Sequence, residues 1–245
     1  MTNKSNRHAD FVLLTLAMSA TVYLGFWFTY FGPIVAGAYP KSSPLVHLHG
    51  WTFFAWYLLL PLQAALIRTK RVRLHRRLGY TSLALASVMF LSGLTVVGVQ
   101  MRDALASAEP SFWLAAGPAI FATLILFAAF YSAALVLRRN GAYHKRLIIV
   151  ASAAGMGAAA FRILGVAFGQ VMWVLPASIL MTNLFIVAGM VLDQLREGRI
   201  HLVYLIGLPV CVAMELGLYL ATPTPAGQVI ARGLAWVGNS LGFLY

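Results

Sequence analysis

Long apolar runs separated by short polar stretches dominate the pattern of this chain. A helix needs about 20 mostly apolar residues to cross the hydrocarbon core of a bilayer. The single-residue alternation that is typical of half-buried strands is absent. The pattern therefore predicts an all-α, polytopic membrane helix bundle that forms one domain over residues 1–245. Seven runs are long enough to span, near residues 11–32, 44–67, 78–100, 112–137, 147–169, 172–192 and 202–221.

The two ends of the pattern need separate interpretation. The first run, 11–32, exceeds the roughly 7–15 residues of a signal-peptide core, so we expect it to be a retained span. The last stretch, 226–245, is shorter and contains Arg232 and Asn239. It follows Pro223 and Pro225, and two readings stay open for it: a helix lying in the interface or a short eighth span.

Composition agrees with a membrane protein. The chain is 61% hydrophobic and 10% charged, whereas soluble domains carry about 25% charged residues. The only cysteine, Cys211, excludes an intrachain disulfide framework, a cysteine-based zinc site and a c-type haem motif. The formal net charge of +12 would suit nucleic acid. The cations lie in short loops between apolar runs, however, so we expect the lipid bilayer and not nucleic acid as the partner.

The loops alternate in charge. By the positive-inside rule this alternation places the N-terminus and three basic loops in the cytoplasm of a multi-pass protein, as in a bacterial inner membrane. The intervening loops carry only Lys41 and Arg102. The basic loops contain Arg68, Lys70, Arg71, Arg73, Arg76 and Arg77 in the first, Arg138, Arg139, Lys145 and Arg146 in the second, and Arg196 and Arg199 in the third.

A histidine follows each basic loop, at the start of the next apolar run. These residues are His75, His144 and His201, and the topology puts all three in one cytoplasmic layer with Gln63 and Asp193. Neutral imidazoles bind first-row metals, and two opposed imidazoles bind haem iron axially. The layer therefore suggests a haem b or a histidine-bound metal. The alternative is that these side chains anchor the helices at the interface.

Polar side chains inside the spans form a second set of candidates, because they are costly in hydrocarbon. His49, Trp56 and Gln63 recur every seven residues, so they share one helix face. This stripe either lines a cavity or packs between helices.

The other buried candidates are Arg162 and Glu215. Arg162 lies 18 residues beyond His144 and Glu215 lies 14 beyond His201, each on about the same face of a continuous helix. Both fall in the outer half of the membrane. An ion pair between them, with His49 nearby, is therefore one expectation.

Several of these residues together resemble an uncharacterised family of bacterial seven-helix integral membrane proteins. The matching segments are His75-Arg76-Arg77-Leu78-Gly79 and His144-Lys145-Arg146-Leu147, with their spacing to Gln63 and Arg162. The resemblance implies the seven-helix architecture and no activity. A looser similarity is to transmembrane b-type cytochromes, through His49-Gly50 and Leu74-His75-Arg76. The outer histidines of that pattern are incomplete here, which leaves an inner haem held by His75 and His144, with His201 as the other candidate ligand.

Three functional classes remain from the sequence. One is a membrane redox protein that binds haem or metal through the cytoplasmic histidines. Another is a small-solute or proton-coupled transporter that uses Arg162, Glu215 and His49. The last is a structural or assembly protein, acting with membrane partners or as a homo-oligomer. No enzyme motif is present, so catalytic residues cannot be named.

Overall fold

The protein is described by a computed structural model that covers residues 4–107, 109, 111–169 and 171–245. Every element in these ranges is helical, as the pattern predicts. The long helices are α1 (Lys4–Phe26), α3 (Pro44–Arg68), α4 (Val72–Ala106), α5 (Phe112–Val136), α6 (Gly141–Ala154), α7 (Gly157–Phe168), α8 (Val174–Glu197), α9 (Leu202–Ala221) and α10 (Pro225–Leu241); shorter ones are the π-helical segment η1 (Trp27–Phe31), α2 (Gly32–Val35) and the 3-10 turn η2 (Gly242–Leu244).

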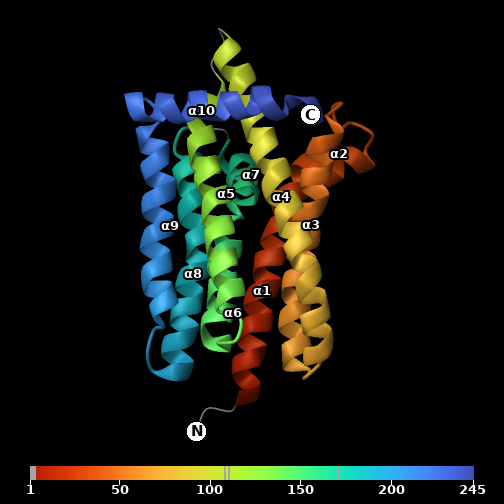
Figure 1. Cartoon of the computed structure of the whole chain (residues 1–245), viewed down its shortest axis with the longest axis vertical. Coiled ribbons are helices and arrows are strands. Elements are labelled where there is room, and N and C mark those ends of the chain that lie inside the picture. Colours follow the sequence, from red (N-terminus) through yellow and green to blue (C-terminus); the bar gives the residue numbers. More distant parts are fainter. Residues whose placement is uncertain (1–3, 108, 110, 170) are drawn as a thin grey trace.

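The long helices run side by side in one bundle (Figure 1). Within the described residues, six helices are long and apolar enough to cross a membrane. The pair α6 and α7 would make a seventh span if it crosses as one unit. The helices are thus those of a multi-pass integral membrane protein.

Short turns bring consecutive helices back alongside each other. Side chains at the helix starts accept hydrogen bonds from the first free backbone N–H groups, which would otherwise lack partners. Residues with positive φ, Lys70 (58°) and Gly198 (70°), reverse the chain after α3 and α8. The capping residues are Ser43 for α3, Ser111 for α5, Asn140 for α6, His201 for α9 and Thr224 for α10.

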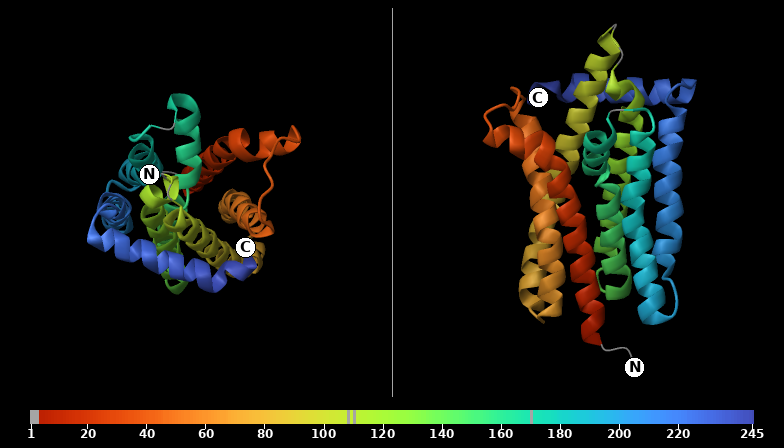
Figure 2. Two further views of the ribbon diagram at one scale, coloured as in Figure 1. Left: turned by 90° about the horizontal axis from the view of Figure 1, so that it is seen from above. Right: turned by 180° about the vertical axis from the view of Figure 1, so that it is seen from behind.

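The three basic turns share one end of the bundle. The α3–α4, α5–α6 and α8–α9 turns lie at the same end as the N-terminus, while α2 and α10 lie at the other (Figures 1 and 2). His75, His144 and His201 start their helices at this end, as the alternation of charge predicts. We call it the basic end and the opposite one the α10 end.

The expected continuous span over 147–169 is broken. Helices α6 and α7 meet at an angle of 45° across Gly155 and Met156. The hydroxyl of Tyr57, on α3, donates to the carbonyl of Ser152 at 2.6 Å. That carbonyl is the acceptor that Met156 N–H would use in a continuous α-helix, and Met156 N–H bonds to Ala153 instead. A side chain inserted into the backbone ladder is a known cause of sharp kinks, and it removes the common face expected for His144 and Arg162.

The C-terminal helix α10 lies across the end of the bundle rather than along it (Figures 1 and 2). It packs chiefly on α4. Glycines at the crossing, Gly98 and Gly238, let the two backbones approach: a Cβ built on Gly238 would lie 2.2 Å from the Gly98 carbonyl oxygen. Of the two readings of 226–245, the short eighth span is not the arrangement found, because α10 runs across the bundle and not along it.

This crossing gives a test of the fold. Gly238→Ala should destabilise the protein by about 1–3 kcal/mol, because the added methyl group meets backbone that cannot move aside. Gly233→Ala is the matched control on the same helix, since nothing lies within 4 Å of its Cβ position. Thermal unfolding in detergent should show a lower Tm for Gly238→Ala alone. Equal Tm values for the two variants would mean that α10 does not dock as described.

Candidate functional site

The face of α3 that carries His49, Trp56 and Gln63 points into the bundle. His49 Nδ1 lies 3.1 Å from the Ser92 hydroxyl of α4, and the Trp56 indole donates to Ser152 of α6 at 3.2 Å. The Oε1 atom of Gln63 is buried and has no hydrogen-bond partner in the described part of the chain. The stripe predicted on α3 thus points into the bundle. It extends from the α10 end toward the basic end and contacts α4 through His49 and α6 through Trp56.

Next to the basic end of this stripe, two of the three predicted histidines face each other. The imidazole rings of His75, on α4, and His144, on α6, have centroids 6.4 Å apart and planes at 86°. His144 Nδ1 lies 2.8 Å from the carbonyl oxygen of Ala134, the last turn of α5. A carbonyl only accepts, so Nδ1 carries a proton, and in the neutral tautomer Nε2 is the nitrogen that carries the lone pair.

The imidazole of His75 differs from that of His144 in its hydrogen bonding. Nδ1 of His75 is buried and finds no hydrogen-bond partner among the described residues, as is also true of Gln63 Oε1. Buried polar atoms without partners are uncommon in folded proteins. Further toward the middle of the bundle, Trp56 meets Tyr131 edge to face at 5.2 Å, and Tyr131 shares a 2.7 Å hydrogen bond with Ser82 of α4.

The third histidine does not join this pair, which corrects the expectation of a three-histidine site. His201 Nδ1 accepts from Val203 N–H at 3.2 Å and so caps α9. Its ring lies edge to face on Tyr143, with centroids 4.6 Å apart. Across the described residues, no group of three or more His, Cys, Asp or Glu side chains gathers in a way that could hold a metal ion.

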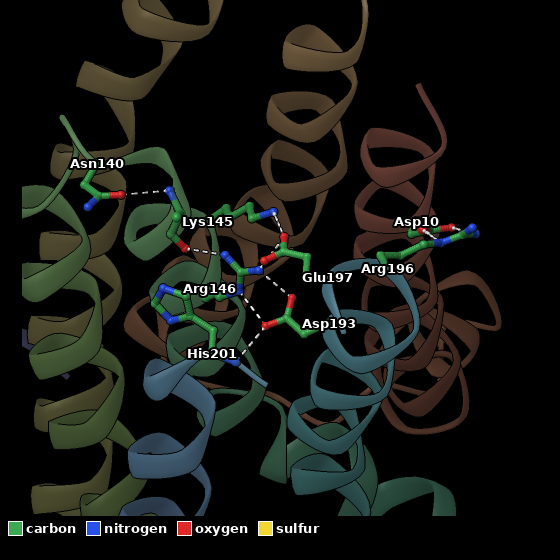
Figure 3. A network of polar contacts seen from close by, with 9 residues as sticks. Asp10, Asn140, Lys145, Arg146, Asp193, Arg196, Glu197 and His201 are labelled. Carbon is green, nitrogen blue, oxygen red and sulfur yellow. Dashed lines mark hydrogen bonds and ion pairs between the residues drawn. The ribbon is translucent and has the colours of Figure 1, made fainter. Parts of the chain in front are cut away.

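His201 belongs instead to a buried ionic network at the basic end (Figure 3). Arg146 is 0% exposed and its guanidinium donates to both oxygens of Asp193, at 2.7 and 2.5 Å. It also contacts Glu197 at 2.9 Å and the carbonyl of Ala142. The backbone N–H of His201 donates to Asp193 at 3.2 Å. Three groups from α6 and α8 thus meet at one guanidinium, and the start of α9 is joined to the same network through Asp193.

Sequence reasoning singled out Asp193 but treated Arg146 only as a topology signal. One signal could have identified it: a carboxylate directly after an apolar run, at the membrane boundary, needs a cation at the same depth if it is buried. Arg146 is the cation of the second basic loop that lies nearest to the following run, directly before Leu147.

The expected ion pair between Arg162 and Glu215 is wrong. Arg162 donates to the Thr29 hydroxyl at 2.9 Å, and its guanidinium lies 4.3 Å from the ring centre of Phe26. Glu215 is 1% exposed and accepts from the Asn183 amide, on α8, at 3.0 Å. The two side chains stabilise different helix contacts.

Comparisons with known proteins do not identify the chain: no family model, no curated protein and no solved structure matches it. The candidate site therefore stands on its own geometry.

Removing Arg146 or Asp193 alone should destabilise the protein strongly. Arg146→Met leaves a buried carboxylate and Asp193→Leu leaves a buried guanidinium, and each change should cost about 3–5 kcal/mol. The double variant should recover much of that loss, because the remaining carboxylate, Glu197, is partly exposed and still lies 3.9 Å from the Lys145 ammonium. Asp103→Asn, in an exposed pair with Arg102, is the control and should change stability by less than about 1 kcal/mol. Additive effects in the double variant would argue against a direct buried pair.

His201 should make the stability of the fold depend on pH. Burial, and next the Arg146 guanidinium, lower the pKa of His201 below 6.5, although Asp193 and Glu197 oppose the shift. The folded state then binds this proton less readily than the unfolded state, so stability is complete above about pH 6.5 and falls as the pH drops toward the folded pKa.

His201→Asn keeps an oxygen that can cap α9 but removes the titrating ring. Unfolding midpoints between pH 5 and 8 should fall on the acid side for the wild type and change less for the variant. Identical profiles for the two proteins would exclude His201 as the source.

Proposed function

We propose that this membrane protein binds one haem b between α4 and α6, with His75 and His144 as the two axial ligands, and takes part in one-electron transfer. We further propose that it resides in a bacterial inner membrane with the basic end in the cytoplasm, since three basic turns share that end. The observation that carries the haem proposal is the facing of the two imidazoles at 6.4 Å.

The separation of the two rings matches what one metal centre needs. One metal ion bound by a nitrogen of each imidazole, with metal–nitrogen bonds of about 2.0–2.1 Å, would hold the ring centroids roughly 6 Å apart. The hydrogen bond from His144 Nδ1 to Ala134 supports the same role, because metal-binding histidines usually donate their other N–H to a carbonyl or carboxylate.

The number of ligands favours haem over a bare metal ion. A structural zinc site takes four protein ligands and a catalytic one takes three. The described residues bring only two histidines together here. A haem supplies four equatorial nitrogens itself, so two axial histidines complete its coordination.

Neighbouring side chains fit the edges of such a site. The unpartnered Nδ1 of His75 and Oε1 of Gln63 lie at the polar side. Further into the bundle the rings of Trp56, Phe127 and Tyr131 pack together, with Trp56 and Phe127 5.0 Å apart. Apolar surroundings with few polar groups are typical of cofactor sites. When bound, the haem would supply one-electron redox chemistry, and the protein would set its orientation and exclude water.

The transport hypothesis has less support. It depended on Arg162 and Glu215 acting as one coupled pair, and these residues bind to Thr29 and Asn183 instead.

Visible spectroscopy on the purified protein tests the proposal. Protein produced with added haem precursor, in mild detergent, should show a Soret band that shifts on reduction. His75→Ala and His144→Ala should each abolish it. His75→Met should retain haem with a raised reduction potential, because a methionine ligand favours ferrous iron.

His201→Asn is the matched control, since it lies in the same layer but outside the pair, and its spectrum should equal that of the wild type. A colourless wild-type protein after incubation with haemin, or an unchanged spectrum in His75→Ala, would contradict the proposal.

A further inference from the structure

At the α10 end of the molecule, far from the histidine pair, α10 presents an apolar stripe outward. Val229 and Trp236 of α10 and Phe243 of the following turn η2 are spaced seven residues apart and are 60%, 69% and 81% exposed. The opposite face of α10, with Ala231 and Leu234, is buried against the bundle. A helix that lies across the end of a membrane bundle with an exposed tryptophan on an apolar stripe is typical of the lipid headgroup interface.

Beside α10 the surface is hollowed. A groove of about 920 Å³ lies between the ends of α5 and α9 and the flank of α10. Its walls are mainly apolar, with Leu114 from α5, Tyr219 and Leu220 from α9, and Ala231 from α10. The Thr222 hydroxyl, which contacts the carbonyls of Ala115 and Leu218, ties α9 to α5 at this place. The volume falls within the roughly 300–1,000 Å³ of small-molecule sites.

One cationic side chain lines this groove. Arg232 lines it together with Gln228, one helical turn earlier on α10. Arg232 is exposed, and the described residues place no acidic side chain within ion-pair distance of it. A guanidinium with Gln228 beside it presents several N–H donors to an anion, and guanidinium is well suited to phosphate.

We propose that this groove is a binding site for one anionic phospholipid of the adjacent leaflet. Its phosphate binds to Arg232 and Gln228, and one acyl chain lies along Leu114, Tyr219 and Leu220. The charge and the apolar walls are both needed for this assignment. A water-soluble anion would use Arg232 alone and leave the walls in contact with solvent, whereas a phospholipid at the interface satisfies both.

Native mass spectrometry and thermal unfolding with defined lipids test the site. After delipidation, the wild type should retain phosphatidylglycerol about fivefold more than phosphatidylcholine, the preference that one basic residue gives near an anionic lipid surface. Phosphatidylglycerol should also raise Tm more than phosphatidylcholine does. Inorganic phosphate should give no rise, since it has no acyl chain.

Three variants separate the parts of the site. Arg232→Gln should abolish the preference for the anionic lipid, and Leu220→Trp, at an exposed position that lines the groove, should reduce lipid retention without changing charge. Lys41→Gln is the matched control, because it removes an exposed cation at the same end of the bundle but outside the groove. Equal binding of the two lipids by the wild type, wild-type retention in Arg232→Gln or in Leu220→Trp, or a Tm rise with inorganic phosphate would overturn the proposal.

Discussion

The buried pair of Arg146 and Asp193 is the interaction on which the basic end of the molecule depends. Each charge alone would cost several kcal/mol to remove from water, so α6 and α8 are stable in their places only together. The backbone N–H of His201 joins the start of α9 to the same carboxylate. The hydrogen bonds and ion pairs of Arg146, Asp193 and His201 can all form at only one relative position of α6, α8 and α9. Sliding one helix along another would leave a buried charge without its partner, which is unfavourable.

This constraint also determines the proposed cofactor site. His144 lies two residues before Arg146 on α6, so the ion pair fixes the depth and rotation of the helix that carries it. From the other side, Trp56 and Tyr57 of α3 both hydrogen-bond to Ser152 of α6. Helix α6 is therefore held at two levels, and its first turn faces His75 on α4. A site organised in advance in this way binds its ligand with less loss of conformational entropy.

The sequence was sufficient to predict the class of fold, the inward face of α3 and the shared end of the three histidines, because hydropathy, charge alternation and helical period are local signals. It could not predict which helices are neighbours. The proposed pairing of Arg162 with Glu215 failed for that reason, and so did the grouping of His201 with the other two histidines. The sequence also did not indicate the break between α6 and α7 at Gly155. Its cause is a hydrogen bond from the hydroxyl of Tyr57, almost a hundred residues earlier in the chain.

Electron paramagnetic resonance of the oxidised, haem-loaded protein tests the central claim most directly, because it reports the ligands and their relative orientation. Two axial imidazoles with nearly perpendicular planes, as the 86° angle between His75 and His144 requires, should give a low-spin ferric signal of strong anisotropy. A high-spin ferric signal, which indicates that an axial ligand is missing, or no protein-bound haem signal at all would contradict the account.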